Sequence, residues 1–228
     1  WTLDWLGFLP GKRESKRYLG DYLLTQNDVR AGGKFADIAA YGGWPMDDHN
    51  PEGFWHKGEP TIFHPAPSPF GIPYRSLYSR NVENLFCAGR NISATHAAFS
   101  STRVMATCAV MGQAVGTAAA IATENGINPR GVHEKRLAEL QNTLMEDDCY
   151  LPGLKRTIPA ITMEAALSAS EGNAEALRNG WDRPVGDNDN AWEAKPGNFA
   201  EYAFATPVKL TEARLVFDSG MSNGRPYM

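Results

Sequence analysis

Apolar residues recur at helical spacing in the middle of the chain, where residues 104–123 carry no charge. Positions three or four apart form a stripe of medium-sized apolar side chains: Val104, Cys108, Met111, Val115, Ala118 and Ala122. A second stripe consists mostly of small residues: Met105, Ala109, Gly112, Gly116 and Ala119. This spacing predicts a long helix from about residue 101 to 125, ended by Gly126. The face with medium-sized side chains would pack against the rest of the protein, and the face with small residues would let a flat or extended group approach the backbone closely.

The same segment meets two criteria for a membrane helix, because it lacks charge and contains a GxxxG pair at Gly112 and Gly116. Its Ala, Gly and Thr content, its few large aliphatic residues and its central Gln113 favour a buried helix of a soluble protein instead. We therefore predict no membrane span.

The pattern around this helix predicts an α/β arrangement. Residues 132–147 predict a second helix, with Leu137, Leu140 and Leu144 on one face. Residues 84–88 predict a short apolar strand that ends at Gly89, and residues 18–29 predict a strand followed by a helix that begins at Asn27 or Asp28. Prolines exclude a helix interior from residues 60–79.

Beyond residue 152 the pattern changes from helical to strand-like. Short strand-like runs occupy residues 160–163, 201–205 and 213–218, and a polar loop spans residues 180–197. We therefore predict an α/β domain over residues 1–152 and an all-β module, incomplete in this sequence, over residues 153–228. The chain opens on Trp1 and stops directly after a strand-like run, so we treat it as a piece of a longer protein. The localisation accordingly stays open.

Composition and charge exclude several function classes. Apolar residues make up 43% and charged residues 21%, as in ordinary globular proteins. The net charge of −4 argues against a general nucleic-acid binder. The three cysteines form no CxxC pair, which argues against a disulfide scaffold and a cysteine-rich zinc site. The loop 187–190 (DNDN) lacks the glycine and terminal glutamate of a calcium hand, so we predict a solvated turn and no metal.

The candidate chemistry lies in residues 84–120, which combine a strand, a turn and a helix. Gly89 closes the strand, a polar loop with Arg90, Asn91 and Ser93 follows, and Arg103 opens the helix. In open α/β sheets ligands collect at such strand ends. The spacing by itself is equally compatible with an ordinary crossover that packs an alanine-rich helix.

Residues 84–120 resemble the C-terminal flavin-binding segment of the FAD-dependent oxidoreductase family, within the glutathione-reductase-like flavoproteins. Two upstream elements add to the resemblance: residues 11–17 (GKRESKR) are similar to the family's Arg-Glu-Ser-Arg/Lys-Arg element, and residues 72–77 (IPYRSL) to its Pro-Tyr-Arg-x-Leu turn. The resemblance implies that FAD lies between an N-terminal Rossmann-like half and this returning segment. It covers about residues 10–150.

By position, the resemblance implies a set of FAD contacts. Gly89 and Arg90 would lie near the pyrophosphate and ribityl chain, within the loop that also carries Asn91 and Ser93. Residues 112–114 (Gly112, Gln113 and Ala114) would approach the pyrimidine end of the flavin, with Arg103 in the same neighbourhood. The chain contains no GxGxxG. The half that binds the ADP part of FAD would therefore belong to a segment of the same protein outside this sequence.

A flavin accepts hydride, and the protein orients the substrate and handles a proton. The candidates for proton handling are His49 and His96. Arg13, Arg17 and Arg75 are candidates for holding an anionic or polyhydroxylated substrate, with Arg75 placed at the catalytic centre and Tyr74 beside it as a substrate contact. The competing interpretation makes these arginines structural ion-pair partners of residues 47–48.

Residues 181–220 resemble the start of a galactose-binding-like, discoidin-type β-sandwich, a module often found on extracellular carbohydrate-active proteins. The resemblance implies a carbohydrate-related partner and favours an extracytoplasmic location. We therefore predict a flavin-dependent hydride transfer from a small or carbohydrate substrate. The alternative is a carbohydrate-binding or polysaccharide-processing protein with a vestigial flavin segment, in which exposed Trp181 and Trp192 would stack on sugars.

Overall fold

The computed structural model describes residues 2–7, 16–185, 187 and 189–217. The chain divides into two compact units, Trp1–Pro152 and Gly153–Met228. The first unit contains these elements: α1 (Gln26–Arg30), β1 (Ile38–Gly42), β2 (Met46–His49), β3 (Thr61–His64), β4 (Phe70–Pro73), α2 (His96–Thr102), α3 (Met105–Glu124), α4 (Pro129–Lys135) and α5 (Leu137–Glu146). The second contains α6 (Ala160–Glu164), β5 (Ala166–Ala169) and β6 (Ala200–Ala203). The 3₁₀ turns are Gly53–Trp55, Tyr74–Ser76, Gly89–Asn91 and Ala174–Arg178.

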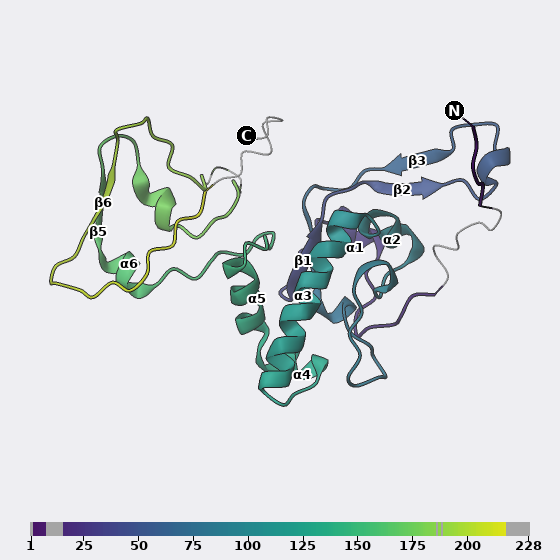
Figure 1. The fold of residues 1–228 in the computed structure, drawn as a ribbon, viewed down its shortest axis with the longest axis horizontal. Coiled ribbons are helices and arrows are strands. Elements are labelled where there is room, and N and C mark those ends of the chain that lie inside the picture. Colours follow the sequence, from purple (N-terminus) through teal and green to yellow (C-terminus); the bar gives the residue numbers. More distant parts are fainter. Residues whose placement is uncertain (1, 8–15, 186, 188, 218–228) are drawn as a thin grey trace. The chain divides into compact units, whose positions relative to one another are not determined.

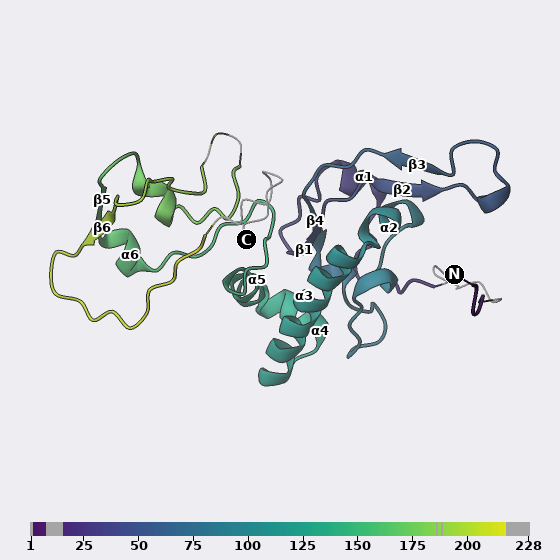
Figure 2. The same cartoon turned by 45° about the horizontal axis from the view of Figure 1, so that its top comes forward.

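The core of the first unit lies between a small sheet and the long helix α3. β1 and β4 pair antiparallel, from Ile38 opposite Pro73 to Gly42 opposite Phe70. α3 packs on β1, and α4 and α5 pack on α3 (Figure 1; Figure 2). These mixed helices and small sheets agree with the predicted α/β fold.

α3 follows the predicted helical periodicity, but its buried line differs from the predicted stripe. The buried residues are Thr107, Met111, Ala114, Ala118, Ile121 and Ala122. The small-residue stripe faces outward: Met105 is 87% exposed, and a Cβ added at Gly112 or Gly116 would meet no atom within 4 Å. By length and composition α3 also satisfies the criteria for a membrane span, which is weak evidence because core helices of soluble proteins satisfy them too.

Both predicted long helices are divided in two. The helix predicted over residues 101–125 is α2 followed by α3, because Val104 is extended (φ −70°, ψ 148°). Contacts with the neighbouring strand hold α2 in a separate direction: the Ser101 hydroxyl donates to the Trp44 carbonyl, and Arg103 binds Asp47. The second helix begins earlier than predicted, at Pro129, because Asn128 caps it and proline suits a first turn. It is interrupted at Arg136.

Two predicted strands of this unit are absent as regular elements in the described chain. Residues 84–88 make only an isolated bridge, Tyr78 with Phe86. Residues 18–24 are irregular and end in a parallel bridge between Leu24 and Ala94. α1 begins at Gln26, one residue earlier than predicted, because Thr25 forms a capping box with Asp28.

The second unit contains one antiparallel pair, β5 with β6, from Ala166 opposite Ala203 to Ala169 opposite Ala200. The strand predicted at residues 201–205 corresponds to β6. The strand predicted at residues 160–163 is wrong, since these residues form α6. Residues 213–217 are exposed and form no strand, and Asp218 lies outside the described residues. Within the described part of the unit, the strands do not form a sandwich.

Candidate functional site

Three arginines surround the ring of Phe99 on α2. The guanidinium carbon of Arg90 lies 5.2 Å from the ring centroid, that of Arg17 lies 5.7 Å away and that of Arg103 lies 6.0 Å away. These distances fall within the range of cation–π contacts. Phe99 itself is 1% exposed, so the ring is a fixed base for the three charges. We call these four residues the Phe99 platform.

The loop that follows Gly89 is fixed by backbone hydrogen bonds to two segments, residues 18–24 and the turn at Ser76. Gly89 has φ +80°, which glycine adopts readily. The Asn91 carbonyl accepts from the Tyr18 amide (3.1 Å), and the Ser93 amide donates to the Ser76 carbonyl (3.1 Å). The Ser93 carbonyl in turn accepts from the Leu24 amide (3.0 Å). Because these hydrogen bonds use backbone groups, the side chains of the loop are available for a ligand.

Three side chains of this loop hold buried polar atoms that have no hydrogen-bond partner in the described part of the chain. They are Arg90 Nη2, Asn91 Oδ1 and Ser93 Oγ. Buried polar atoms are satisfied in most proteins, and leaving one unsatisfied costs about 1–3 kcal/mol. A ligand that supplies acceptors and donors at this loop would remove that cost.

α3 begins beside the loop and has no side chain capping its N-terminus. The predicted cofactor residues 112–114 lie on different faces of α3. Gly112 and Gln113 are exposed, and Ala114 is fully buried in the core. Gln113 Nε2 lies 3.5 Å from the Asp147 carbonyl. The exposed glycine face therefore leaves the helix backbone accessible at Gly112, whereas Ala114 has no exposed surface.

A cavity of about 220 Å³ lies next to the first turn of α3. It is lined by Tyr41, Gly43, Trp44, Val104, Ala106, Thr107 and Val110. Most of these side chains are apolar, so the space suits a flat or apolar part of a ligand better than a charged one.

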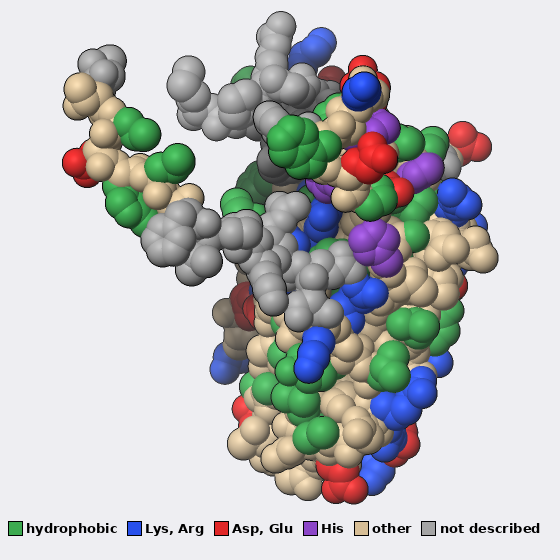
Figure 3. All heavy atoms as spheres, turned by 90° about the vertical axis from the view of Figure 1, so that its right-hand side faces the viewer, with side chains coloured by type: hydrophobic (Ala, Val, Ile, Leu, Met, Phe, Trp, Pro, Cys, Tyr) green, Lys and Arg blue, Asp and Glu red, His purple; other side chains and the backbone are tan. Residues whose placement is uncertain are grey.

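Each predicted proton handler has a carboxylate neighbour, and one of the two carboxylates, Asp47, also pairs with Arg103 of the platform. Asp47 Oδ1 lies 3.5 Å from His49 Nε2, and Asp47 Oδ2 lies 3.4 Å from Arg103 Nη2. Asp48 Oδ1 lies 3.7 Å from His96 Nε2. Both histidines are substantially exposed, and histidine side chains gather on one face of the molecule (Figure 3). Each predicted proton handler thus lies near an aspartate of β2, His49 near Asp47 and His96, at the start of α2, near Asp48.

The remaining predicted substrate residues are placed elsewhere. Arg75 forms a bidentate pair with Asp37, which is 2% exposed. Tyr74 is fully buried, and its hydroxyl donates to the Pro129 carbonyl (2.8 Å), so it is a core residue rather than a substrate contact. Arg13 lies outside the described residues. The competing interpretation made Arg13, Arg17 and Arg75 ion-pair partners of residues 47–48, but the partner of Arg75 is Asp37. Asp47 pairs instead with Arg103, which that interpretation did not include.

Sequence reasoning missed Phe99, and it named residues 47–48 as ion-pair partners without identifying Arg103, His49 and His96 as the residues that they contact. A helical signal existed for the first, since His96, Phe99 and Arg103 stand at positions i, i+3 and i+7. The carboxylates had no such signal, because β2 contacts α2 only in the folded chain.

A family model described as FAD dependent oxidoreductase matches residues 1–144, which is more than half of the 228 residues. The matched region includes the Phe99 platform, the loop after Gly89 and α3. Comparisons with curated proteins and with solved structures gave no match. The predicted family is confirmed: the chain belongs to the FAD dependent oxidoreductase family and is an oxidoreductase that uses FAD.

Proposed function

We propose that this chain supplies the C-terminal part of the flavin site of a glutathione-reductase-like oxidoreductase that removes hydride from a small substrate. The observation that carries the proposal is the open glycine face of α3, which adjoins a loop with three unsatisfied buried polar atoms. When bound, FAD supplies the hydride acceptor. Gly89, Asn91 and Ser93 would hold its polar chain, and Gly112 and Gln113 would adjoin its ring.

The residues present suit FAD for physical reasons. A helix N-terminus without a cap carries partial positive charge, which favours an electron-rich group beside it. Gly112 and Gly116 leave room for a planar ring at the helix surface. The chain contains no GxGxxG, so the ADP part would be held by an N-terminal Rossmann-like half of the same protein.

His96 and His49 remain the candidates for taking the substrate proton. Each has a carboxylate neighbour, Asp48 at 3.7 Å from His96 Nε2 and Asp47 at 3.5 Å from His49 Nε2. His49 Nδ1 is also 2.9 Å from the Thr61 hydroxyl, which holds the ring in one orientation. His96 has the more exposed side chain of the two. It is therefore the better placed to meet a substrate from solvent.

The test of the cofactor site is the Gly112→Val variant of the full-length purified protein. Since nothing lies within 4 Å of a Cβ at Gly112, the apo protein should keep its stability within about 0.5 kcal/mol. The added methyl groups would occupy the space of the ring, so flavin content should fall at least about tenfold. Absorbance near ~450 nm measures flavin content, and thermal unfolding measures stability.

Ala120→Val is the matched control, because Ala120 is also exposed on α3 and lies about 12 Å further along the helix. It should retain wild-type flavin content. A Gly112→Val protein with full FAD would show that the ring does not lie on this face. A folded wild-type protein that never binds FAD after reconstitution would refute the proposed flavin site altogether.

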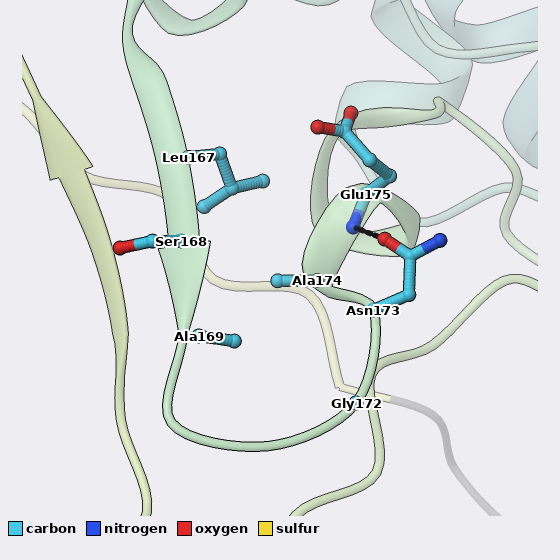
Figure 4. Close-up of a pocket in the computed structure, with 7 residues that line it drawn as sticks. All are labelled: Leu167, Ser168, Ala169, Gly172, Asn173, Ala174 and Glu175. Carbon is cyan, nitrogen blue, oxygen red and sulfur yellow. Dashed lines mark hydrogen bonds between the residues drawn. The ribbon is translucent and has the colours of Figure 1, made fainter.

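The alternative, sugar binding by the second unit, receives less support. Trp181 is half-buried under Lys155, whose ammonium lies 4.8 Å from its ring centroid, and Trp192 Nε1 donates to the Glu171 carbonyl. Both indoles are thus partly buried and already engaged in contacts within the unit. The unit has a cavity of about 310 Å³ beside β5, but the Asn173 side chain in it already caps Glu175 (Figure 4).

A further inference from the structure

One face of the hairpin of β2 and β3 carries a hydroxyl, an imidazole and a carboxylate side by side. His49 and Thr61 stand opposite each other in the register of the hairpin, so their side chains share a face. His49 Nδ1 is 2.9 Å from Thr61 Oγ1, which is hydrogen-bond distance. Asp47 precedes His49 by two residues on β2 and therefore belongs to the same face.

One carboxylate oxygen of Asp47 lacks a hydrogen bond. Asp47 Oδ1 is buried and has no hydrogen-bond partner in the part of the chain that the structure describes, but it lies 3.5 Å from His49 Nε2. The rest of the aspartate is held by Arg103, whose Nη2 lies 3.4 Å from Oδ2 and donates to the Asp47 carbonyl (3.0 Å). An ionised carboxylate only accepts, so Oδ1 needs a donor. A proton on His49 Nε2 would supply it.

A neutral imidazole has one N–H group and one acceptor nitrogen, and the hydrogen bond at one nitrogen decides which is which. We propose that Asp47 is a positioning residue that keeps the proton of neutral His49 on Nε2. His49 Nδ1 is then the basic nitrogen, and it accepts from the Thr61 hydroxyl. Thr61 thereby becomes the catalytic residue that touches the substrate and carries its proton to His49. This inference rests on the proposed function and adds the route of the proton to it.

The relay moves one proton and no electrons. A hydroxyl or amino proton of the substrate passes to Thr61 Oγ1 while the Thr61 hydroxyl proton passes to His49 Nδ1. The electron pair of the broken O–H or N–H bond forms a C=O or C=N bond, as the hydride on that carbon is lost to FAD. The substrate is therefore an alcohol or an amine with its donor on the carbon that is oxidised. His96 would need direct contact with this substrate, whereas His49 reaches it through Thr61.

The first experiment determines which nitrogen of His49 is protonated, from proton–nitrogen NMR spectra of the histidine rings. It uses the full-length purified protein at about pH 8, where ordinary imidazoles are neutral. Wild type should be protonated at Nε2. In Asp47→Ala the ratio of the Nε2–H form to the Nδ1–H form should fall about tenfold or more, the effect of losing one hydrogen bond to a charged group. Asp48→Ala is the matched control, because Asp48 lies on the opposite face of β2 and near His96; the ratio for His49 should not change.

Substitutions of Thr61 test the relay itself. Thr61→Val has nearly the same shape and lacks the hydroxyl, so the nitrogen resonance of His49 Nδ1 should shift. Thr61→Ser keeps the hydroxyl and should keep the wild-type resonance. In the FAD-loaded protein, a panel of small alcohols and amines identifies molecules that bleach the flavin absorbance without oxygen. Thr61→Val should slow this bleaching at least about a hundredfold, the usual value of a positioned proton acceptor, and Thr61→Ser should restore most of the rate.

The contrary outcomes separate the parts of the proposal. A wild-type His49 protonated at Nδ1, or a wild-type ratio in Asp47→Ala, would overturn the role of Asp47. An unshifted Nδ1 resonance or unchanged bleaching in Thr61→Val would overturn the relay. Bleaching only by molecules without a hydroxyl or amino group would overturn the substrate class. A folded wild-type protein that never binds FAD would refute the proposed function, and the NMR measurement on His49 does not depend on that result.

Discussion

Replacing Phe99 by alanine is expected to lower the free energy of unfolding by about 3–5 kcal/mol, the cost of removing a large buried aromatic side chain. Phe99 is 1% exposed, so the cavity left behind is not open to water. The change also removes the ring that all three guanidinium groups contact. The repulsion among the three charges would then no longer be offset by attraction to the ring. Chemical denaturation at neutral pH measures the difference.

Phe63→Ala is the control for this loss. Phe63 is an aromatic residue of the same size on β3, but it is 56% exposed. Its replacement should cost well under 2 kcal/mol, because less apolar area leaves a buried environment. Equal losses for the two variants would contradict the placement of Phe99 in the core. The Phe99→Leu variant, which keeps much of the volume, should recover most of the stability.

Replacing Arg75 by methionine is expected to lower the free energy of unfolding by about 3 kcal/mol. This value lies near the lower end of the cost of removing one partner of a buried ion pair, because Arg75 is partly exposed. Asp37, 2% exposed, would lose the two side-chain bonds that hold its carboxylate. Burial by itself would raise the pKa of Asp37, but hydrogen bonds from the Arg75 side chain and backbone outweigh it and keep that pKa below its usual value.

The pH dependence of this effect follows from the direction of the shift. A carboxyl group whose pKa is lowered by folding stabilises the protein above its unfolded pKa, and this contribution is lost as the pH falls through the folded pKa. In the variant the pKa of Asp37 rises, so protonation relieves the buried charge. The difference between wild type and Arg75→Met should therefore shrink from pH 7 to about pH 3. A difference independent of pH would show that Asp37 is not the cause.

Arg136→Met serves as the control for Arg75→Met. Arg136 and Glu139 form an exposed pair on the surface of α5, and such pairs contribute about 0–1 kcal/mol. The control should therefore change stability little at any pH. If Arg75→Met were as mild as Arg136→Met, the Asp37 pair would not be a stabilising contact of the core.

Local patterns in the sequence predicted the helical periodicity of α3. Helical spacing is a local property, so the segment could be recognised without its neighbours. The same pattern failed at Val104 and Arg136, where it predicted one helix and the protein has two. Those interruptions depend on what α2 and α4 contact elsewhere.

In the candidate site, too, local features could be predicted from the sequence and contacts between distant residues could not. Gly89, the polar loop and α3 are consecutive in the chain, so their proximity was evident from the residues themselves and from the family resemblance. The partners of the arginines were not evident, because Asp37 lies 38 residues before Arg75, and Asp47 lies 56 before Arg103. Tyr74 belongs to a motif that suggested a substrate contact, and its burial against Pro129 removed it from that role.

The sequence by itself therefore determined the family, the cofactor and the helix whose glycine face is available to a ring. Only the tertiary structure decided that Arg17, Arg90 and Arg103 meet around Phe99, and that Asp47 contacts both Arg103 and His49. The physical reason is the distance along the chain over which each kind of interaction acts. Helix periodicity and glycine placement act between neighbours along the chain, whereas charges and buried polar atoms act between groups that only folding brings within a few ångströms of one another.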